Sequence, residues 1–195
     1  MSVQLFPVFD EITAQYLGRM KDRSKVHTEG DWHKGIQANI IRAHGVSFDI
    51  LMQTRSANVD IAKHRYDQSL ATQMIDRDDL QEEKTLFRGL REELAIEKFR
   101  FRQIISRAKV QKTYEYDLEK RNNEIISLYL VEVNAGESIT INSEKTAKIE
   151  WLPWDSFLAF YEANHNNFCK TVQFYLGDAQ LRQEIERQSY AFLGL

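Results

Sequence analysis

Short apolar stretches separated by turn residues run through the first 152 residues, which is the pattern of a strand-rich fold. Residues 3–9 (VQLFPVF) predict a strand, and Pro7 favours an edge position because proline cannot donate a ladder hydrogen bond. Residues 15–20 (QYLGRM) are expected to pair with it after the DEITA turn. IQANII at 36–41 and FDILMQ at 48–53 predict a hairpin, because the intervening AHGVS contains the glycine that a tight turn needs.

One helix interrupts the strands and several helices follow them. Residues 82–94 place Leu86, Phe87, Leu90 and Leu94 at helical spacing, with the acids mostly on other faces. Further strands are expected in four segments: 99–106 (FRFRQIIS), 110–118 (VQKTYEYDL), 124–133 (EIISLYLVEV) and 147–153 (AKIEWLP). After Pro153 the pattern is helical over 154–164, 167–176 and 178–193. Strands followed by helices favour an α+β fold with a mixed sheet.

The sequence does not determine which surface the last helical segment packs against. Its apolar stripe of Leu181, Ile185 and Phe192 is short, so it fits packing on the chain's own core or on a second subunit of a homodimer. No stretch has the composition of a linker, a repeat or a low-complexity tract. We therefore expect a single domain over residues 1–195, with a core at about 9–154 and a helical tail at about 155–195.

Composition and charge narrow the class of protein. The chain has 195 residues, 43% of them hydrophobic, which suits a folded core. Its net charge of −3 gives no electrostatic case for binding a nucleic-acid duplex or a membrane surface. Cys169 is the single cysteine, so neither an internal disulfide nor a cysteine-based zinc site is expected. The sequence also lacks a signal peptide pattern and a long apolar span, and a cytoplasmic location is therefore expected.

The segment RGLREELAI at 88–96 carries the first candidate chemistry. Glu92 and Glu93 are adjacent on the expected helix, so they point about 100° apart but could both reach a divalent ion over the helix edge. Such ions take oxygen ligands, and Mg²⁺ usually combines one or two carboxylates with waters and substrate phosphates. The alternative is an ordinary solvated helix face, in which Arg88 and Glu92 form an i,i+4 ion pair.

This segment resembles the second half of the Nudix box, G-x5-E-x7-R-E-U-x-E-E-x-G-U, where U is apolar. The residues that match are Arg88, Leu90, Glu92, Glu93 and Ile96. Gly89 stands where the pattern has the first glutamate after the arginine, and Ala95 replaces the final glycine. Upstream, Thr72 and Asp78 occupy the positions of the first glycine and first glutamate, and the gap from Asp78 to the arginine is two residues longer than the pattern.

A second resemblance lies far from the box. The segment from Pro7 to Ile41 is similar to the entry of the Nudix branch that includes isopentenyl-diphosphate isomerase and related hydrolases. The matching residues are Asp10, Glu11, Gly18, His27, Gly30, Trp32 and His33. ILMQTRS at 50–56, YDQSLATQ at 66–73 and NNEIISLYLVEV at 122–133 also resemble segments of that branch, so the likeness runs from about Phe9 to Trp154.

The resemblance implies roles for specific side chains. Glu92 and Glu93 would hold Mg²⁺ or Mn²⁺ against a diphosphate, and Glu124 would be a further ligand or base, unless it is an exposed edge charge. Arg88 would orient the glutamates as a planar fork. Arg55 would contact phosphate, unless it is a solvated strand-end arginine. His33 would be structural or would face the substrate.

The same resemblance leaves two functions open. One is a divalent-metal-dependent pyrophosphohydrolase that cuts a small diphosphate-containing metabolite, such as a nucleoside diphosphate linked to another group. The other is a catalytically degenerate Nudix-fold module that binds or senses such a ligand, because Gly89 removes an acid that nothing clearly replaces. Isomerase activity is not expected, because Ala71 and Gln73 stand where that enzyme has its cysteine and a metal-binding histidine.

Overall fold

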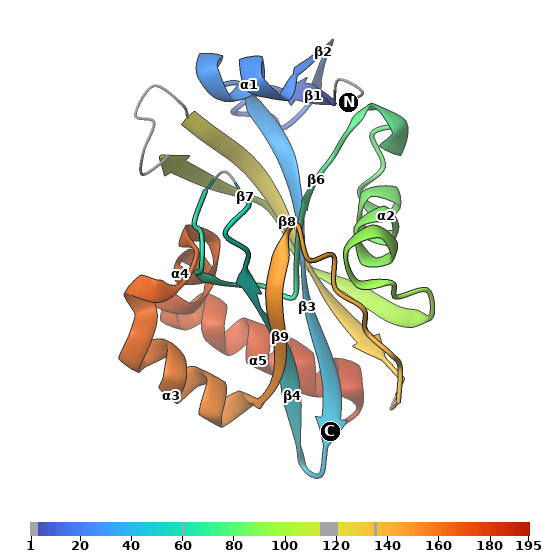
Figure 1. The fold of residues 1–195 in the computed structure, drawn as a ribbon, viewed down its shortest axis with the longest axis vertical. Coiled ribbons are helices and arrows are strands. Elements are labelled where there is room, and N and C mark those ends of the chain that lie inside the picture. The colour runs from blue at the N-terminus through green and yellow to red at the C-terminus, as the bar shows by residue number, and fades with distance from the viewer. Residues whose placement is uncertain (1–3, 60, 114–120, 135) are drawn as a thin grey trace.

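A mixed sheet lies between helical layers in the computed structural model of this chain (Figure 1), which describes residues 4–59, 61–113, 121–134 and 136–195. The strands are β1 (Leu5–Phe9), β2 (Tyr16–Asp22), β3 (Trp32–His44), β4 (Ser47–Arg55), β5 (Tyr66–Asp67), β6 (Leu70–Gln73), β7 (Phe99–Thr113), β8 (Arg121–Val133) and β9 (Thr146–Pro153). The helices are α1 (Arg23–Glu29), α2 (Glu82–Leu94), α3 (Trp154–Asn164), α4 (Lys170–Gly177) and α5 (Ala179–Leu193), with short 3-10 turns at Asp76–Asp78 and His165–Asn167. The expected α+β class with a mixed sheet is confirmed.

The main sheet has the order β5-β4-β3-β8-β7, with β6 added against β3 and β9 against β4. The pair β3–β8 is parallel, whereas the other pairs in this sheet are antiparallel. The expected hairpin of β3 and β4 closes at Gly45, whose φ of 63° is the left-handed conformation that glycine adopts without strain. β3 and β8 are therefore central, which explains why β8 is apolar along most of its length.

Helix α2 covers one face of the sheet. Leu86, Leu90 and Leu94 are at most 1% exposed and pack with residues of β3, β6 and β8, as their spacing predicts. Phe87 is 40% exposed, so it lies outside this buried stripe although it was grouped with it from the sequence. Its ring instead contacts Phe99 and Phe101 of β7.

Helices α3, α4 and α5 cover the opposite face of the sheet (Figure 1). Ile185 and Phe192 of α5 are 1% and 8% exposed and belong to the same apolar cluster as Phe48 and Leu128 of the sheet. Ile185 and Phe192 of the α5 stripe thus pack on this chain's own core, which is one of the two partners that the sequence left open.

Two parts of the chain differ from the sequence expectation. Residues 99–113 form one long strand rather than two, because β7 stays paired with β8 through irregularities in register between Gln103 and Ala108. The expected strand at 110–118 runs partly outside the described residues. Helix α1 was not expected, since seven residues contain too little apolar periodicity, although its ends carry clear signals: Asp22 caps the N-terminus and Gly30 ends it with a positive φ.

Candidate functional site

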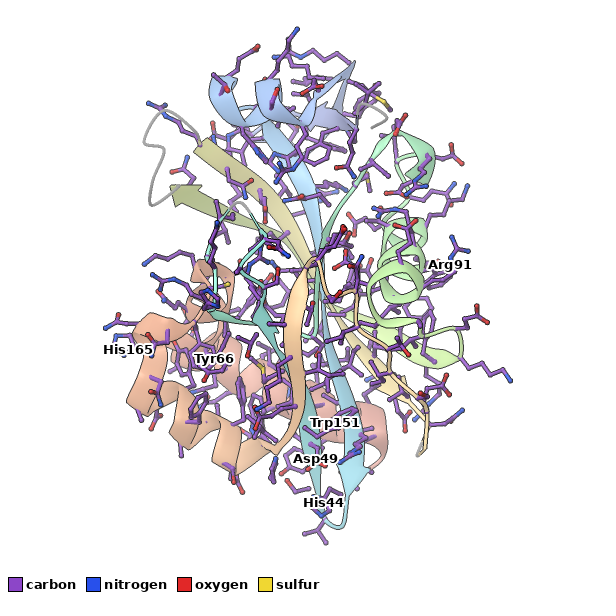
Figure 2. All side chains as sticks on the ribbon, in the orientation of Figure 1. His44, Asp49, Tyr66, Arg91, Trp151 and His165 are labelled. Carbon is purple, nitrogen blue, oxygen red and sulfur yellow. The ribbon has the colours of Figure 1, made fainter. Side chains whose placement is uncertain are left out.

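A cavity of about 800 Å³ opens on the sheet near the N-terminal half of β3. Its walls come from strands β3, β4, β6 and β8, from α2, from the loops before β5 and β9, and from the start of α4. Figure 2 shows the side chains around this region, with Tyr66 on the side of α3 and α4 and Arg91 pointing outward from α2. The cavity therefore collects residues from Gln4 to Thr171, which are 167 positions apart in the chain.

The cavity carries more positive than negative side chains. The cationic lining residues among those described are Arg23, Arg55, Arg65, Arg88, Lys145 and Lys170. The acidic ones are Asp67, Glu93, Glu124 and Glu144. Because the whole chain has a net charge of −3, this local excess of cations is a property of the cavity and favours an anionic ligand.

The two adjacent glutamates of α2 separate in space. Glu93 is 5% exposed, lines the cavity and accepts a hydrogen bond from Lys145 Nζ at 2.7 Å. Glu92 is not among the described residues that line the cavity; its side chain is 37% exposed and bonds to Arg77 at 2.8 Å. The helical rotation between neighbours is the reason, and in this arrangement the two carboxylates that were expected to reach one ion have different cationic partners.

Glu124 is buried in the floor of the cavity. It is 3% exposed, since β8 lies between β3 and β7, and this excludes its alternative interpretation as an exposed edge charge. Its Oε1 accepts hydrogen bonds from Gln73 Nε2 at 3.0 Å and Asn122 Nδ2 at 2.8 Å. Gly35 leaves room for this carboxylate, because a Cβ at that position would lie 3.0 Å from Glu124 Oε2.

Arg88 is anchored mainly by Asp78 rather than by the glutamates. Its Nε and Nη2 donate to Asp78 Oδ1 and Oδ2, each at 2.9 Å, and Nη2 also donates to the Gln73 carbonyl at 2.7 Å. The contact with Glu92 is longer, at 3.5 Å. Of the two glutamates that Arg88 was expected to orient, the described contacts include Glu92 through this longer bond, while the planar fork holds Asp78 and fastens the segment before α2 to the middle of that helix.

Gly89 has a packing role that the sequence did not reveal. A Cβ at this position would lie 2.8 Å from Thr72 Cγ2 and 3.0 Å from Leu70 Cδ2. Helix α2 approaches β6 so closely here that a glutamate does not fit without movement of one element. Gly89 is the position at which the chain lacks a glutamate of the Nudix box, and the side chains of Leu70 and Thr72 fill the space that this glutamate would need.

The other two sequence candidates lie in different environments. Arg55 lines the cavity, donates to Asp67 Oδ2 at 2.9 Å and to the Ile61 carbonyl at 3.2 Å, and is mostly buried rather than a solvated strand end. His33 is fully buried, with its ring 5.3 Å from Phe6 and 5.2 Å from His27, and is not among the described residues that line the cavity. Of the two roles expected for His33, structural or substrate-facing, this packing beneath the N-terminal hairpin favours the structural one.

The described acids do not fit a preformed site for a divalent ion. Across residues 4–59, 61–113, 121–134 and 136–195, no three His, Cys, Asp or Glu side chains converge in a way that could hold a metal. Glu92 bonds to arginines, Glu93 to a lysine and Glu124 to two amides. A hard cation needs several free oxygen ligands, whereas Glu92 and Glu93 are already bonded to cationic side chains and Glu124 Oε1 already accepts two hydrogen bonds from amides.

Lys145, Asp67 and Arg65 were missed from the sequence although they line the cavity. Lys145 lies 52 residues from Glu93 in a loop without a motif, so nothing local marked it. Asp67 pairs with Arg55 across the β4–β5 contact, and nothing in its polar surroundings in the sequence marked it.

Comparisons with known proteins identify the fold. No protein-family model matches the chain, and no curated protein matches it. Among solved structures, DR0079 from Deinococcus radiodurans is similar with a TM-score of 0.61 at 17% identity, over 82% of this chain and 90% of that one. A MutT protein from Methanosarcina mazei Go1 is similar with a TM-score of 0.53 at 12% identity, over 80% and 96%. An Ap4A hydrolase from C. elegans has a TM-score of 0.51 at 11% identity, over 83% and 98%.

These neighbours show that the fold is of the Nudix type. At such identities the likeness concerns the fold alone, and function has to be argued from the site. No helix in the described part of the chain is long and apolar enough to cross a membrane.

Proposed function

We propose that this protein binds a small diphosphate-containing metabolite in the cavity, as a Nudix-fold ligand-binding module. The observation that carries the proposal is the excess of cationic side chains around a cavity of about 800 Å³. That volume suits a ligand the size of a nucleotide or a nucleotide sugar. Arginine and lysine are the side chains that recognise phosphate oxygens, arginine by paired hydrogen bonds and lysine as a point charge.

Two of the cations are held in place before any ligand arrives. Arg55 is fixed by Asp67 and the Ile61 carbonyl, and Arg88 by Asp78 and the Gln73 carbonyl. Holding a donor in position lowers the conformational entropy lost on binding. Arg65, Lys145 and Lys170 lie nearer solvent and could complete the anion's contacts, so a diphosphate would meet both fixed and adaptable donors.

A second candidate is hydrolysis of the diphosphate linkage. The observation that favours it is that Glu93 and Glu124 line the same cavity as the cations. A buried carboxylate in hydrogen-bond reach of a water can act as a general base. We rank this candidate below binding, because Gly89 replaces one acid of the Nudix box, Glu92 lies outside the described lining, and the remaining acids do not fit a divalent site.

Calorimetry with ADP-ribose tests the proposal, once in EDTA and once with Mg²⁺, together with an assay for released nucleotide or phosphate. Binding in EDTA without turnover is expected, and affinity should fall as salt rises because the attraction is electrostatic. Arg65→Gln should weaken binding by about tenfold, the effect of one charged contact. Arg187→Gln, which removes an exposed arginine on α5 paired with Glu184, is the matched control and should change nothing.

Absence of binding by ADP-ribose, pyrophosphate and a panel of nucleoside diphosphates would refute the proposal. Turnover of any of these with Mg²⁺ or Mn²⁺, lost on Glu93→Gln, would instead establish the second candidate.

A further inference from the structure

The ion pair of Lys145 and Glu93 explains why the cavity departs from a divalent-metal site. Glu93 is one of the two acids at the metal-ligand positions implied by the Nudix resemblance, and the one of those two that lines the cavity. A carboxylate that is 5% exposed needs a compensating charge. In this chain the compensating charge is the ammonium of Lys145, whose Nζ lies 2.7 Å from Glu93 Oε1.

The backbone around Lys145 holds the ammonium at this place. The amide of Asn142 donates to the Glu93 carbonyl at 3.0 Å, which ties the loop before β9 to the C-terminal turn of α2. The amide of Lys145 donates to the Asn142 carbonyl at 3.0 Å, and the Lys145 carbonyl accepts from the Ser56 amide at 2.9 Å. The lysine is therefore fixed at its backbone on both sides, and only its side chain is free to adjust.

The ammonium also remains open to a ligand. The Lys145 side chain is 51% exposed and lines the cavity, whereas its partner Glu93 is buried. An ammonium has three donors, so one can stay on Glu93 while others reach a phosphate oxygen. A divalent cation at the same carboxylate oxygen would have to displace the ammonium, because two like charges a few ångströms apart repel strongly in a partly buried site.

We propose that the ammonium of Lys145 takes the place of a divalent ion at Glu93, so that the cavity holds phosphate oxygens without metal. The part concerning phosphate rests on the proposed function, whereas the replacement of the ion at Glu93 can be tested alone. Removal of the lysine charge should leave Glu93 without the cation that bonds to it directly, with only the more distant charge of Arg55 nearby, so that the carboxylate attracts a divalent cation more strongly.

The first experiment titrates Mn²⁺ without any phosphate compound and follows free Mn²⁺ by electron paramagnetic resonance. The wild-type chain should bind Mn²⁺ weakly, and Lys145→Met should bind it at least about tenfold more tightly. The gain should vanish in Lys145→Met with Glu93→Gln. Lys148→Met, which removes an exposed lysine paired with Glu150, is the matched control and should behave as wild type.

Lys145→Arg supplies a variant that keeps the charge and should show no gain. Thermal unfolding of each variant verifies that it is folded. If Lys145→Met does not fold, the wild-type and Lys145→Arg titrations still test the inference, because tight Mn²⁺ binding at Glu93 in either protein would contradict it. Tight Mn²⁺ binding by the wild type that is lost on Glu93→Gln, or a gain in Lys145→Met that persists without Glu93, would overturn the inference.

The second experiment measures inorganic pyrophosphate binding in EDTA. The wild type should bind it, and Lys145→Met should bind it about tenfold more weakly. Wild-type binding that appears only with Mn²⁺ would overturn the inference and leave ligand binding intact. No pyrophosphate binding under either condition would count against the proposed function, while the Mn²⁺ titration would still decide the replacement at Glu93.

Discussion

Asp78 and Arg88 form a buried, two-pronged ion pair that connects the segment before α2 to the middle of that helix. Both bonds are 2.9 Å long, and the side chains are 3% and 9% exposed. The same carboxylate accepts from the Ile75 amide at 2.9 Å and from Thr85 Oγ1 at 3.0 Å. Asp78 therefore joins three elements, the 3-10 turn that contains it, the end of β6 through Arg88, and α2.

Asp78→Asn should destabilise the protein strongly. The substitution leaves the buried Arg88 guanidinium with only its longer contact to Glu92 as counter-charge, and removing one partner of a buried pair costs about 3–5 kcal/mol. The free energy of unfolding, measured with urea, tests this. Asp79→Asn is the matched control, because Asp79 pairs with Lys84 at an exposed position, and its cost should stay below about 1 kcal/mol. Equal effects of the two substitutions would contradict the role given to Asp78.

The stability contributed by Asp78 should be lost in acid. Burial alone would raise the pKa of Asp78, but hydrogen bonds from Arg88, the Ile75 amide and Thr85, with the charge of Arg88, outweigh burial and lower it from its ordinary value. In the unfolded chain the pKa is about 4. Because the folded pKa is lower than the unfolded one, the stability contributed by Asp78 is fully present above the unfolded pKa. It declines as the pH falls through the folded pKa.

This pH dependence can be isolated with the same substitution. Urea unfolding from about pH 7 down to about pH 3 should show a smaller loss of stability in Asp78→Asn than in the wild type, because the variant lacks the titrating group. Parallel curves for the two proteins would show that Asp78 does not contribute to the acid response.

Gly89→Ala should destabilise the protein although alanine is the better helix former. The gain in helix propensity is about 1 kcal/mol, whereas forcing a methyl group into a packed contact typically costs about 1–3 kcal/mol. The new Cβ would lie 2.8 Å from Thr72 Cγ2, so Thr72→Ser should recover part of the loss by removing that methyl group. A stabilised Gly89→Ala protein, measured by urea unfolding, would show that α2 can move away from β6 at little cost.

Ile185→Ala should destabilise the protein by about 2–5 kcal/mol, the usual cost of truncating a buried aliphatic side chain. Ile185 is 1% exposed within the cluster that α5 forms on the sheet. Ile12→Ala, at a position that is 85% exposed, is the matched control and should stay within about 0.5 kcal/mol. Unfolding of both variants that does not depend on protein concentration would support packing of α5 within one chain. A loss of stability at Ile185 as small as that at Ile12 would show that α5 does not contribute to the core.

Local periodicity determined much of the fold from the sequence. The spacing of Leu86, Leu90 and Leu94 predicted α2 and its buried face, and the glycine between β3 and β4 predicted their hairpin. These features depend on which positions of a helix or strand face the same way, and that follows from the helical and strand repeats alone. Cap residues at Asp22 and Gly30 also marked a helix, but seven residues are too few for periodicity to show it.

The candidate site depended on tertiary structure. The sequence indicated that Glu92 and Glu93 could carry chemistry, but only the packing of α2 showed that Glu93 faces the cavity while Glu92 turns to Arg77. Likewise, Lys145 reaches Glu93 from 52 residues away, and Gly89 is required by its approach to Thr72. The physical reason is that apolar periodicity is a property of one segment, whereas the partner of a charge and the space beside a Cα are set by segments distant in sequence.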